Sequence, residues 1–118
     1  MNFSRCTIVR AADTAIVTLV GDLDASELDA VAGDVDRLCA RPPGRVVLDL
    51  GAVTFLGSSG LCMLLRIREA VLCTGGTLIV TEVSRPASRL FEITSTDRLF
   101  APTELVAQTE RQPAGAEI

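Results

Sequence analysis

Two adjacent serines bracketed by glycines, Gly57-Ser58-Ser59-Gly60, form the stretch of this sequence best suited to chemistry. They follow an apolar run and precede Leu61, Leu64 and Leu65, whose spacing is helical. Ser59 can therefore cap the helix that begins here, because the first N–H groups of a helix lack partners. The same N–H groups and the positive end of the helix dipole also favour a phosphate at this place. Capping and phosphate acceptance are both consistent with the residues.

The residue types that the chain lacks argue against catalysis by these serines. The sequence has no histidine, and all eleven of its basic residues are arginine. A Ser–His pair, a Schiff-base lysine and a Walker A phosphate loop are therefore unavailable. The spacing also differs from the G-x-S-x-G motif of hydrolases, because the second glycine of that motif would fall on Leu61. We expect a protein that is not an enzyme.

Composition and charge limit the cofactors and partners that we expect. The chain has no histidine to bind a metal, and Cys6, Cys39, Cys62 and Cys73 show no C-x-x-C spacing. These cysteines are expected to be reduced, buried thiols. A net charge of −4 and the lack of tyrosine and tryptophan argue against nucleic-acid binding. We expect no metal, no cofactor and no nucleic acid.

The chain shows no sign of a membrane segment and has the length of one domain. No apolar run approaches the about 20 residues of a membrane helix, and residues 1–5 lack the apolar core of a secretory signal. We therefore expect a cytoplasmic protein without a membrane partner.

Residues 1–111 are predicted to form one domain. Residues 112–118, which are small, polar and contain proline and glycine, are predicted to be a disordered tail.

The hydrophobic pattern predicts that strands and helices alternate along the chain. Strands are predicted near residues 6–9, 15–20, 46–50 and 77–80, with a short fifth one at 98–101. Helices are predicted between residues 24 and 41, at 59–74, from 84 to 93, and from 102. This order is typical of an α/β fold with a mixed sheet of four to five strands. The first two strands form an antiparallel hairpin, and helices connect the later, parallel strands and pack against the sheet.

Several details sharpen this prediction. Gly21 is expected to end the second strand, and Asp24 or Ser26 to cap the first helix. Asp49 is expected near the end of its strand, where its carboxylate is hydrogen-bonded to nearby backbone. Ile93 is included, with Ala87, Leu90 and Phe91, in the buried face of the third helix.

Three stretches carry a resemblance to a known family. Gly21-Asp22-Leu23-Asp24, the run from Val46 to Leu61, and the run from Ile93 to Phe100 resemble the STAS domain, in particular the small bacterial anti-sigma factor antagonists. The resemblance implies the fold of that family over roughly residues 6–106. It also implies that the unphosphorylated protein binds an anti-sigma factor, which is commonly a serine kinase, and so releases a sigma factor. A phosphatase would reverse the phosphorylation.

The resemblance assigns roles to the serine loop and its neighbours. Ser58 matches the phosphorylated position of the family, and Ser59 is the second candidate. The family's aspartate before the first serine is replaced by Gly57, which removes a carboxylate from the helix end. An alternative interpretation is an accessory STAS subunit of a transport or signalling complex in which Ser58 is never modified. The residues implied in partner binding are Asp22, Asp24, Gly57, Ser58, Ser59, Gly60 and Leu61.

Overall fold

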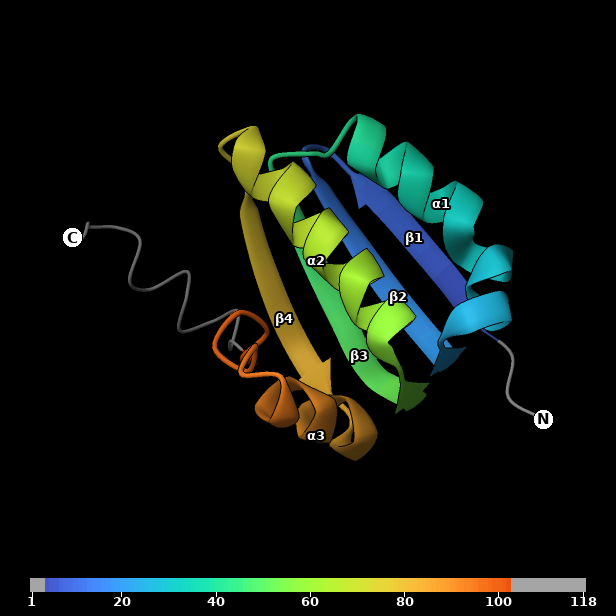
Figure 1. The fold of residues 1–118 in the computed structure, drawn as a ribbon. Helices are drawn as coiled ribbons and strands as arrows, with labels where there is room; N and C mark the ends of the chain where they lie inside the picture. The colour runs from blue at the N-terminus through green and yellow to red at the C-terminus, as the bar shows by residue number, and fades with distance from the viewer. Residues whose placement is uncertain (1–3, 103–118) are drawn as a thin grey trace.

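The computed structural model describes residues 4–102 and places them in one mixed sheet with helices packed on it (Figure 1). The elements in chain order are β1 (Arg5–Ala11), β2 (Thr14–Leu23), the 3₁₀ turn η1 (Ala25–Leu28), α1 (Asp29–Ala40), β3 (Arg45–Leu56), α2 (Ser58–Cys73), β4 (Thr77–Val83) and α3 (Arg85–Ile93). The strands lie in the order β1-β2-β3-β4. β1 is antiparallel to β2, and the other neighbours are parallel. The predicted α/β fold with an N-terminal hairpin is confirmed.

The core lies between the sheet and the two helices α1 and α2, which cover the same face (Figure 1). The strands contribute alternate residues such as Val17, Leu19 and Leu48, all of which are fully buried. Helix α1 contributes Val31, Val35 and Leu38, whose spacing of four and three residues places them on one face. The core residues of α2 are Leu61, Leu64, Ile67 and Val71. Burial of side chains of this size contributes about 1.5–3 kcal/mol each, which holds α2 firmly on the sheet.

Two strands are longer than predicted, and this changes what precedes the serines. β2 does not end at Gly21. This glycine adopts a φ of +95° at a register shift between β2 and β3, and the strand continues to Leu23. β3 continues to Leu56, so the serine loop follows directly on a strand. Asp49 therefore lies inside β3 and not near its end. Its carboxylate accepts a hydrogen bond from the Gly51 N–H at 2.9 Å, as the predicted pairing with backbone requires.

The region after β4 differs more from the prediction. Helix α3 begins after Ser84 as expected, but Ile93 is 72% exposed and does not belong to the buried face. Residues 98–101 form a turn and not a strand, with only a single bridge from Pro102 to Val80. The turn is held by Phe100, whose ring stacks on Phe91 at 4.8 Å between centroids. The fourth helix was predicted to begin at Pro102, which forms this bridge; the rest of that helix and the predicted tail at 112–118 lie outside the described residues.

The cysteines and the C-terminal end of α2 differ in part from the prediction. All four thiols are free, but Cys62 and Cys73 are exposed, so the expectation of burial is wrong for these two. Cys73 donates a hydrogen bond to the Glu69 carboxylate, which raises the pKa of the Cys73 thiol. Helix α2 ends at Cys73, one residue before its predicted end, and Gly75 shortly after it has a φ of +78° that suits glycine.

Candidate functional site

The candidate site lies where β2 and β3 end side by side. The two strands run parallel, and Leu23 is paired with Leu56 at their ends. The N–H of Gly57 donates to the Leu23 carbonyl at 3.1 Å, which joins the start of α2 to the end of β2. The structure thus brings the predicted acidic stretch, Asp22 and Asp24, next to the predicted serine loop. Carboxyl ends of parallel strands are the usual position of sites in α/β folds.

Gly60 sets how closely α2 approaches these strand ends. A Cβ at this position would overlap the carbonyl oxygen of Leu23 and lie 2.7 Å from Cδ1 of Leu56. Backbone cannot move aside as a flexible side chain can, so this position requires glycine. The next residue, Leu61, is buried in the core and packs the first turn of α2 against the sheet. The first turn of α2 is therefore held rigidly against the sheet.

Ser58 and Ser59 are the first two residues of α2, and both are exposed. The N-cap position is Gly57, and no side chain caps the helix, so the predicted cap by Ser59 is wrong. Gly57 has extended backbone, with a φ of −100° and a ψ of −177°, so the helix begins at Ser58, one residue earlier than predicted, and both hydroxyls lie inside its first turn. Neither hydroxyl has a hydrogen-bond partner among residues 4–102. The site therefore presents two free hydroxyls beside uncapped N–H groups.

The two aspartates of the β2 end occupy different environments. The Asp22 carboxylate accepts a hydrogen bond from the Thr54 hydroxyl at 2.5 Å, and the Ser4 hydroxyl donates to the Asp22 carbonyl. These contacts tie the N-terminal end of the described chain and β3 to the end of β2. Asp22 is therefore engaged in holding the strand ends together.

Asp24 lies directly against the serine loop. It occupies the N-cap position of η1, but its side chain makes no capping hydrogen bond, so the predicted cap by Asp24 or Ser26 is not formed. A Cβ on Gly57 would overlap the Asp24 carboxyl group. The Asp24 carboxylate thus fills the space in which a side chain at position 57 would begin. It places a negative charge beside the α2 N-terminus, where the dipole favours one.

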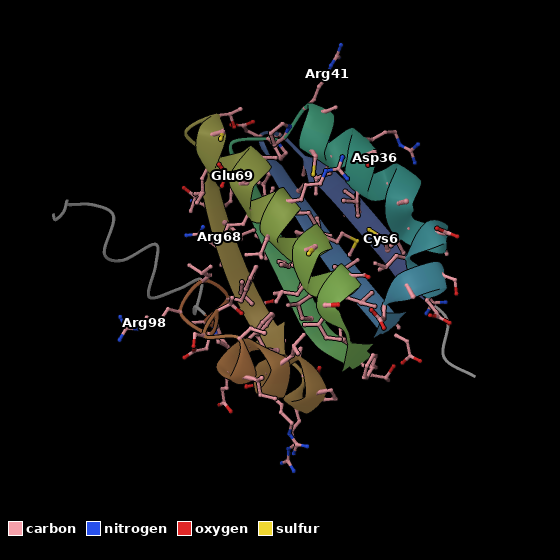
Figure 2. All side chains as sticks on the ribbon, in the orientation of Figure 1. Cys6, Asp36, Arg41, Arg68, Glu69 and Arg98 are labelled. Carbon is pink, nitrogen blue, oxygen red and sulfur yellow. The ribbon has the colours of Figure 1, made fainter. Side chains whose placement is uncertain are left out.

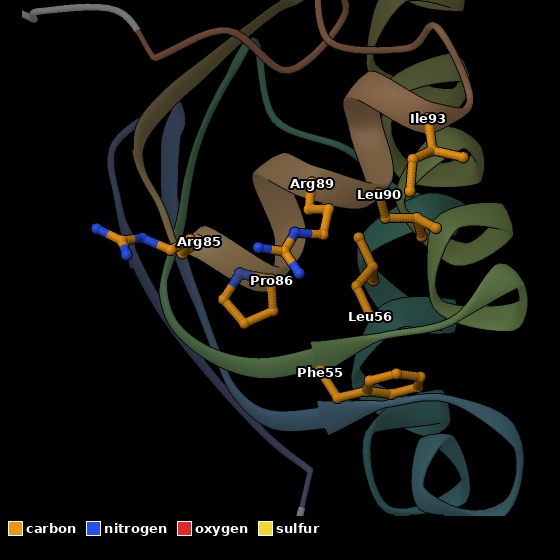
Figure 3. Close-up of a pocket in the computed structure, with 7 residues that line it drawn as sticks. All are labelled: Phe55, Leu56, Arg85, Pro86, Arg89, Leu90 and Ile93. Atoms are coloured by element: carbon orange, nitrogen blue, oxygen red, sulfur yellow. The ribbon is translucent and has the colours of Figure 1, made fainter.

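Two grooves flank the serine loop, and neither was predicted from the sequence. The first, of about 350 Å³, lies between the end of β3 and α3. We call it the β3–α3 groove; its lining residues are Phe55, Leu56, Arg85, Pro86, Arg89, Leu90 and Ile93 (Figure 3). The second, of about 300 Å³, lies between α1 and α2, and its lining residues are Leu28, Ala32, Val35, Ser59, Cys62, Met63 and Arg66. For the second groove, the available signal in the sequence was the apolar character of α2 on more than one face.

The charge at the edge of the second groove is fixed by an ion pair. Arg66 of α2 lies 2.7 Å from the Asp36 carboxylate of α1, which Figure 2 labels. This hydrogen bond raises the pKa of the Arg66 guanidinium. The pair bridges the two helices on the surface, next to the groove that Ser59 lines.

Neither a cluster of metal-binding side chains nor a helix able to span a membrane occurs in the described part of the chain. No group of three or more metal-binding side chains occurs within residues 4–102. In the same range, no helix combines the length and the apolar character needed to cross a bilayer. What the arrangement offers is two exposed hydroxyls, uncapped backbone N–H groups, one carboxylate and two apolar grooves. These are the components of a contact surface for another protein.

The chain thus has an N-terminal hairpin followed by alternating helices and parallel strands. Two exposed hydroxyls lie at the start of its second helix. The family model of the STAS domain matches residues 6–112, and the chain therefore belongs to the STAS domain family. The resemblance noted from the serine loop and its neighbours is confirmed at this level.

Solved structures of anti-sigma factor antagonists share this fold. SpoIIAA in its unphosphorylated form matches with a TM-score of 0.71 and 14% identity over 91% of this chain and 95% of that one. An antagonist from Mycobacterium paratuberculosis matches with 0.70 and 24% identity over 91% and 92%. The Bacillus cell fate determinant SpoIIAA in its phosphorylated form matches with 0.66 and 14% identity over 91% and 98%. At these identities the likeness concerns the fold.

Proposed function

We propose that this protein is an anti-sigma factor antagonist. It binds a serine-kinase anti-sigma factor through the surface around Ser58 and thereby releases a sigma factor for transcription. The observation that carries this proposal is the position of Ser58 at the first residue of α2, where its hydroxyl is exposed and has no hydrogen-bond partner among residues 4–102. The similarity in fold to antagonists solved with and without a phosphate supports it.

Phosphorylation of Ser58 is the switch in this proposal. A phosphate adds a charge of about −1.5 to −2 and three acceptor oxygens, which the uncapped N–H groups of α2 can bind. In a protein interface the same charge costs desolvation and repels acidic groups. The neighbouring Asp24 carboxylate adds to the local negative charge. The modified protein thus stays folded, while the complex is weakened and a phosphatase is needed to restore it.

A second candidate function rests on Gly57. The aspartate that the family pattern places before the first serine is missing, so a kinase that requires it would not act on this chain. In that case the protein is an accessory STAS subunit of a transport or signalling assembly, with Ser58 unmodified. Both candidates are binding proteins and not enzymes.

The test measures complex formation with the kinase-type anti-sigma factors of the same organism by titration calorimetry. We expect a 1:1 complex with the wild type and with Ser58→Ala. Ser58→Glu should weaken it at least about tenfold, because the introduced charge lies at the centre of the interface. Ala40→Glu, which adds the same charge at the exposed far end of α1, is the control and should leave the affinity unchanged. Equal affinities for wild type and Ser58→Glu would exclude the phosphorylation switch.

A further inference from the structure

The β3–α3 groove has an apolar floor and exposed apolar walls. Figure 3 shows Phe55 and Leu56 at the end of β3, facing Leu90 and Ile93 of α3 across the opening. Phe55 is 50% exposed and Ile93 is 72% exposed. Exposed apolar side chains that gather around a hollow mark interaction sites, because covering them releases about 25 cal/mol for each Å² removed from water. This groove has the properties of a docking surface.

Two arginines line the same groove. Arg85 and Arg89 are one helical turn apart on α3, and both are exposed. Neither forms an ion pair or a hydrogen bond with any residue in the described range 4–102. The chain as a whole is acidic, with a net charge of −4. Two unpaired guanidinium groups beside an apolar floor therefore complement a segment that carries both apolar and carboxylate side chains.

The groove is continuous with the serine loop. The side chain of Leu56 lines the groove and also lies against Gly60 in the first turn of α2. Gly57 and Ser58 follow Leu56 directly in the chain. Ser58 is thus two residues along the chain from a lining residue of the groove, so a protein seated over Ser58 lies close to it.

We propose that an acidic amphipathic helix of the anti-sigma factor docks in the β3–α3 groove. Its apolar side chains fill the space between Phe55 and Ile93, and its carboxylates bind Arg85 and Arg89. Helices that bind in grooves place apolar residues at intervals of three and four, and carboxylates one turn apart match the spacing of the two arginines. This inference rests on the proposed function and adds a second contact, separate from Ser58, that determines which anti-sigma factor is recognised.

The test compares groove variants in the same titration with the anti-sigma factor. Arg89→Glu and Ile93→Ser should each weaken the complex about fivefold or more, since charge reversal and loss of an apolar anchor act on the centre of the contact. Both side chains are exposed, and unchanged thermal unfolding will show that the fold is intact. The control is Arg41→Glu, an exposed arginine at the opposite end of the molecule (Figure 2), which should leave the affinity within about twofold. Raising the salt concentration should weaken the wild-type complex more than that of Arg89→Glu.

The possible results separate this inference from the proposed function. If Ser58→Glu weakens the complex but Arg89→Glu and Ile93→Ser do not, the groove inference is wrong and the proposed function stands. If the wild type binds no kinase-type anti-sigma factor, both are wrong. Light scattering that shows a dimer of the free protein, lost in Ile93→Ser, would assign the groove to a second copy of the chain. Sedimentation with phosphatidylglycerol vesicles, lost in Arg89→Glu, would assign it to a lipid surface; either result overturns the inference.

Discussion

Helices α2 and α3 each follow a parallel strand and each have serine at their N-terminal end, but the serines occupy different positions relative to the helix start. In α3, Ser84 is the N-cap residue, and its hydroxyl accepts a hydrogen bond from the Ala87 N–H at 3.3 Å. In α2 the N-cap residue is Gly57, and Ser58 and Ser59 lie inside the first turn, where their hydroxyls form no hydrogen bond with the described part of the chain. A shift of one position relative to the helix start separates a stabilising serine from one that is available to a kinase or a partner.

The difference between the N-cap residues of α2 and α3 also has a consequence for stability. A serine at the N-cap contributes about 1 kcal/mol relative to alanine but only about a few tenths of a kcal/mol relative to glycine, so α2, with Gly57 at its N-cap, gives up only the smaller amount. Its position on the sheet is maintained by packing and by the close approach of Gly60 to Leu23. The start of α2 is thus rigid in position but leaves its donors and hydroxyls open. That combination suits a site that must accept and release a phosphate.

The largest expected effect concerns the approach of α2 to the strand ends. Gly60→Ala should lower the free energy of unfolding by about 3 kcal/mol, because its Cβ would overlap the Leu23 carbonyl. Gly33→Ala, at an exposed position of α1 where the nearest atom to a new Cβ is 3.6 Å away, should raise it by up to about 1 kcal/mol. Urea unfolding measures both. A Gly60→Ala variant as stable as wild type would show that the approach is not rigid.

The second largest expected effect compares the contributions of serine to stability at the N-terminal ends of α3 and α2. Ser84→Ala should lower the free energy of unfolding by about 1 kcal/mol, because the Ala87 N–H loses its partner. Ser58→Ala and Ser59→Ala should each change it by less than about 0.5 kcal/mol, since neither hydroxyl makes a hydrogen bond within the described structure. Thermal or urea unfolding distinguishes these values. An equal loss for Ser58→Ala and Ser84→Ala would remove the contrast.

The smallest effect concerns Asp24 and Gly57. Gly57→Ala should be more destabilising in the wild type than in an Asp24→Ala background, because the new Cβ must displace the Asp24 carboxyl group. We expect a coupling free energy of about 0.5 kcal/mol, in the range typical of residues in contact. A double-mutant cycle measured by urea unfolding gives this value. Additive effects would mean that Asp24 does not occupy the space above Gly57.

Much of the scaffold was predictable because burial leaves a pattern in the sequence. The apolar run at residues 46–50 and the stripe of Val31, Val35 and Leu38 both correspond to faces buried in the core. The extension of β3 to Leu56 was not predictable, since Gly51 favours a turn locally and pairing with β2 overrides that preference. Interactions between distant residues decide such boundaries.

The residues of the candidate site were proposed from the sequence, and their role stays a prediction; their arrangement was not predicted. The serine loop was identified from its glycines and its place before an apolar helix. The position of Asp24 over Gly57 and the β3–α3 groove depend on how separate elements meet, and no local pattern records this. The exposure of Ile93 was missed for the same reason. Its place in the helical stripe matched a buried residue, but no described element covers it.

The contrast between the two helix starts is tested most directly by phosphorylation. The wild type, Ser58→Ala and Ser84→Ala are incubated with the kinase-type anti-sigma factor and ATP, and their intact masses are measured. We predict that the wild type and Ser84→Ala each gain the mass of one phosphate, which peptide mapping places on Ser58, and that Ser58→Ala gains none. No mass gain on the wild type, or a phosphate on Ser84, would contradict the account.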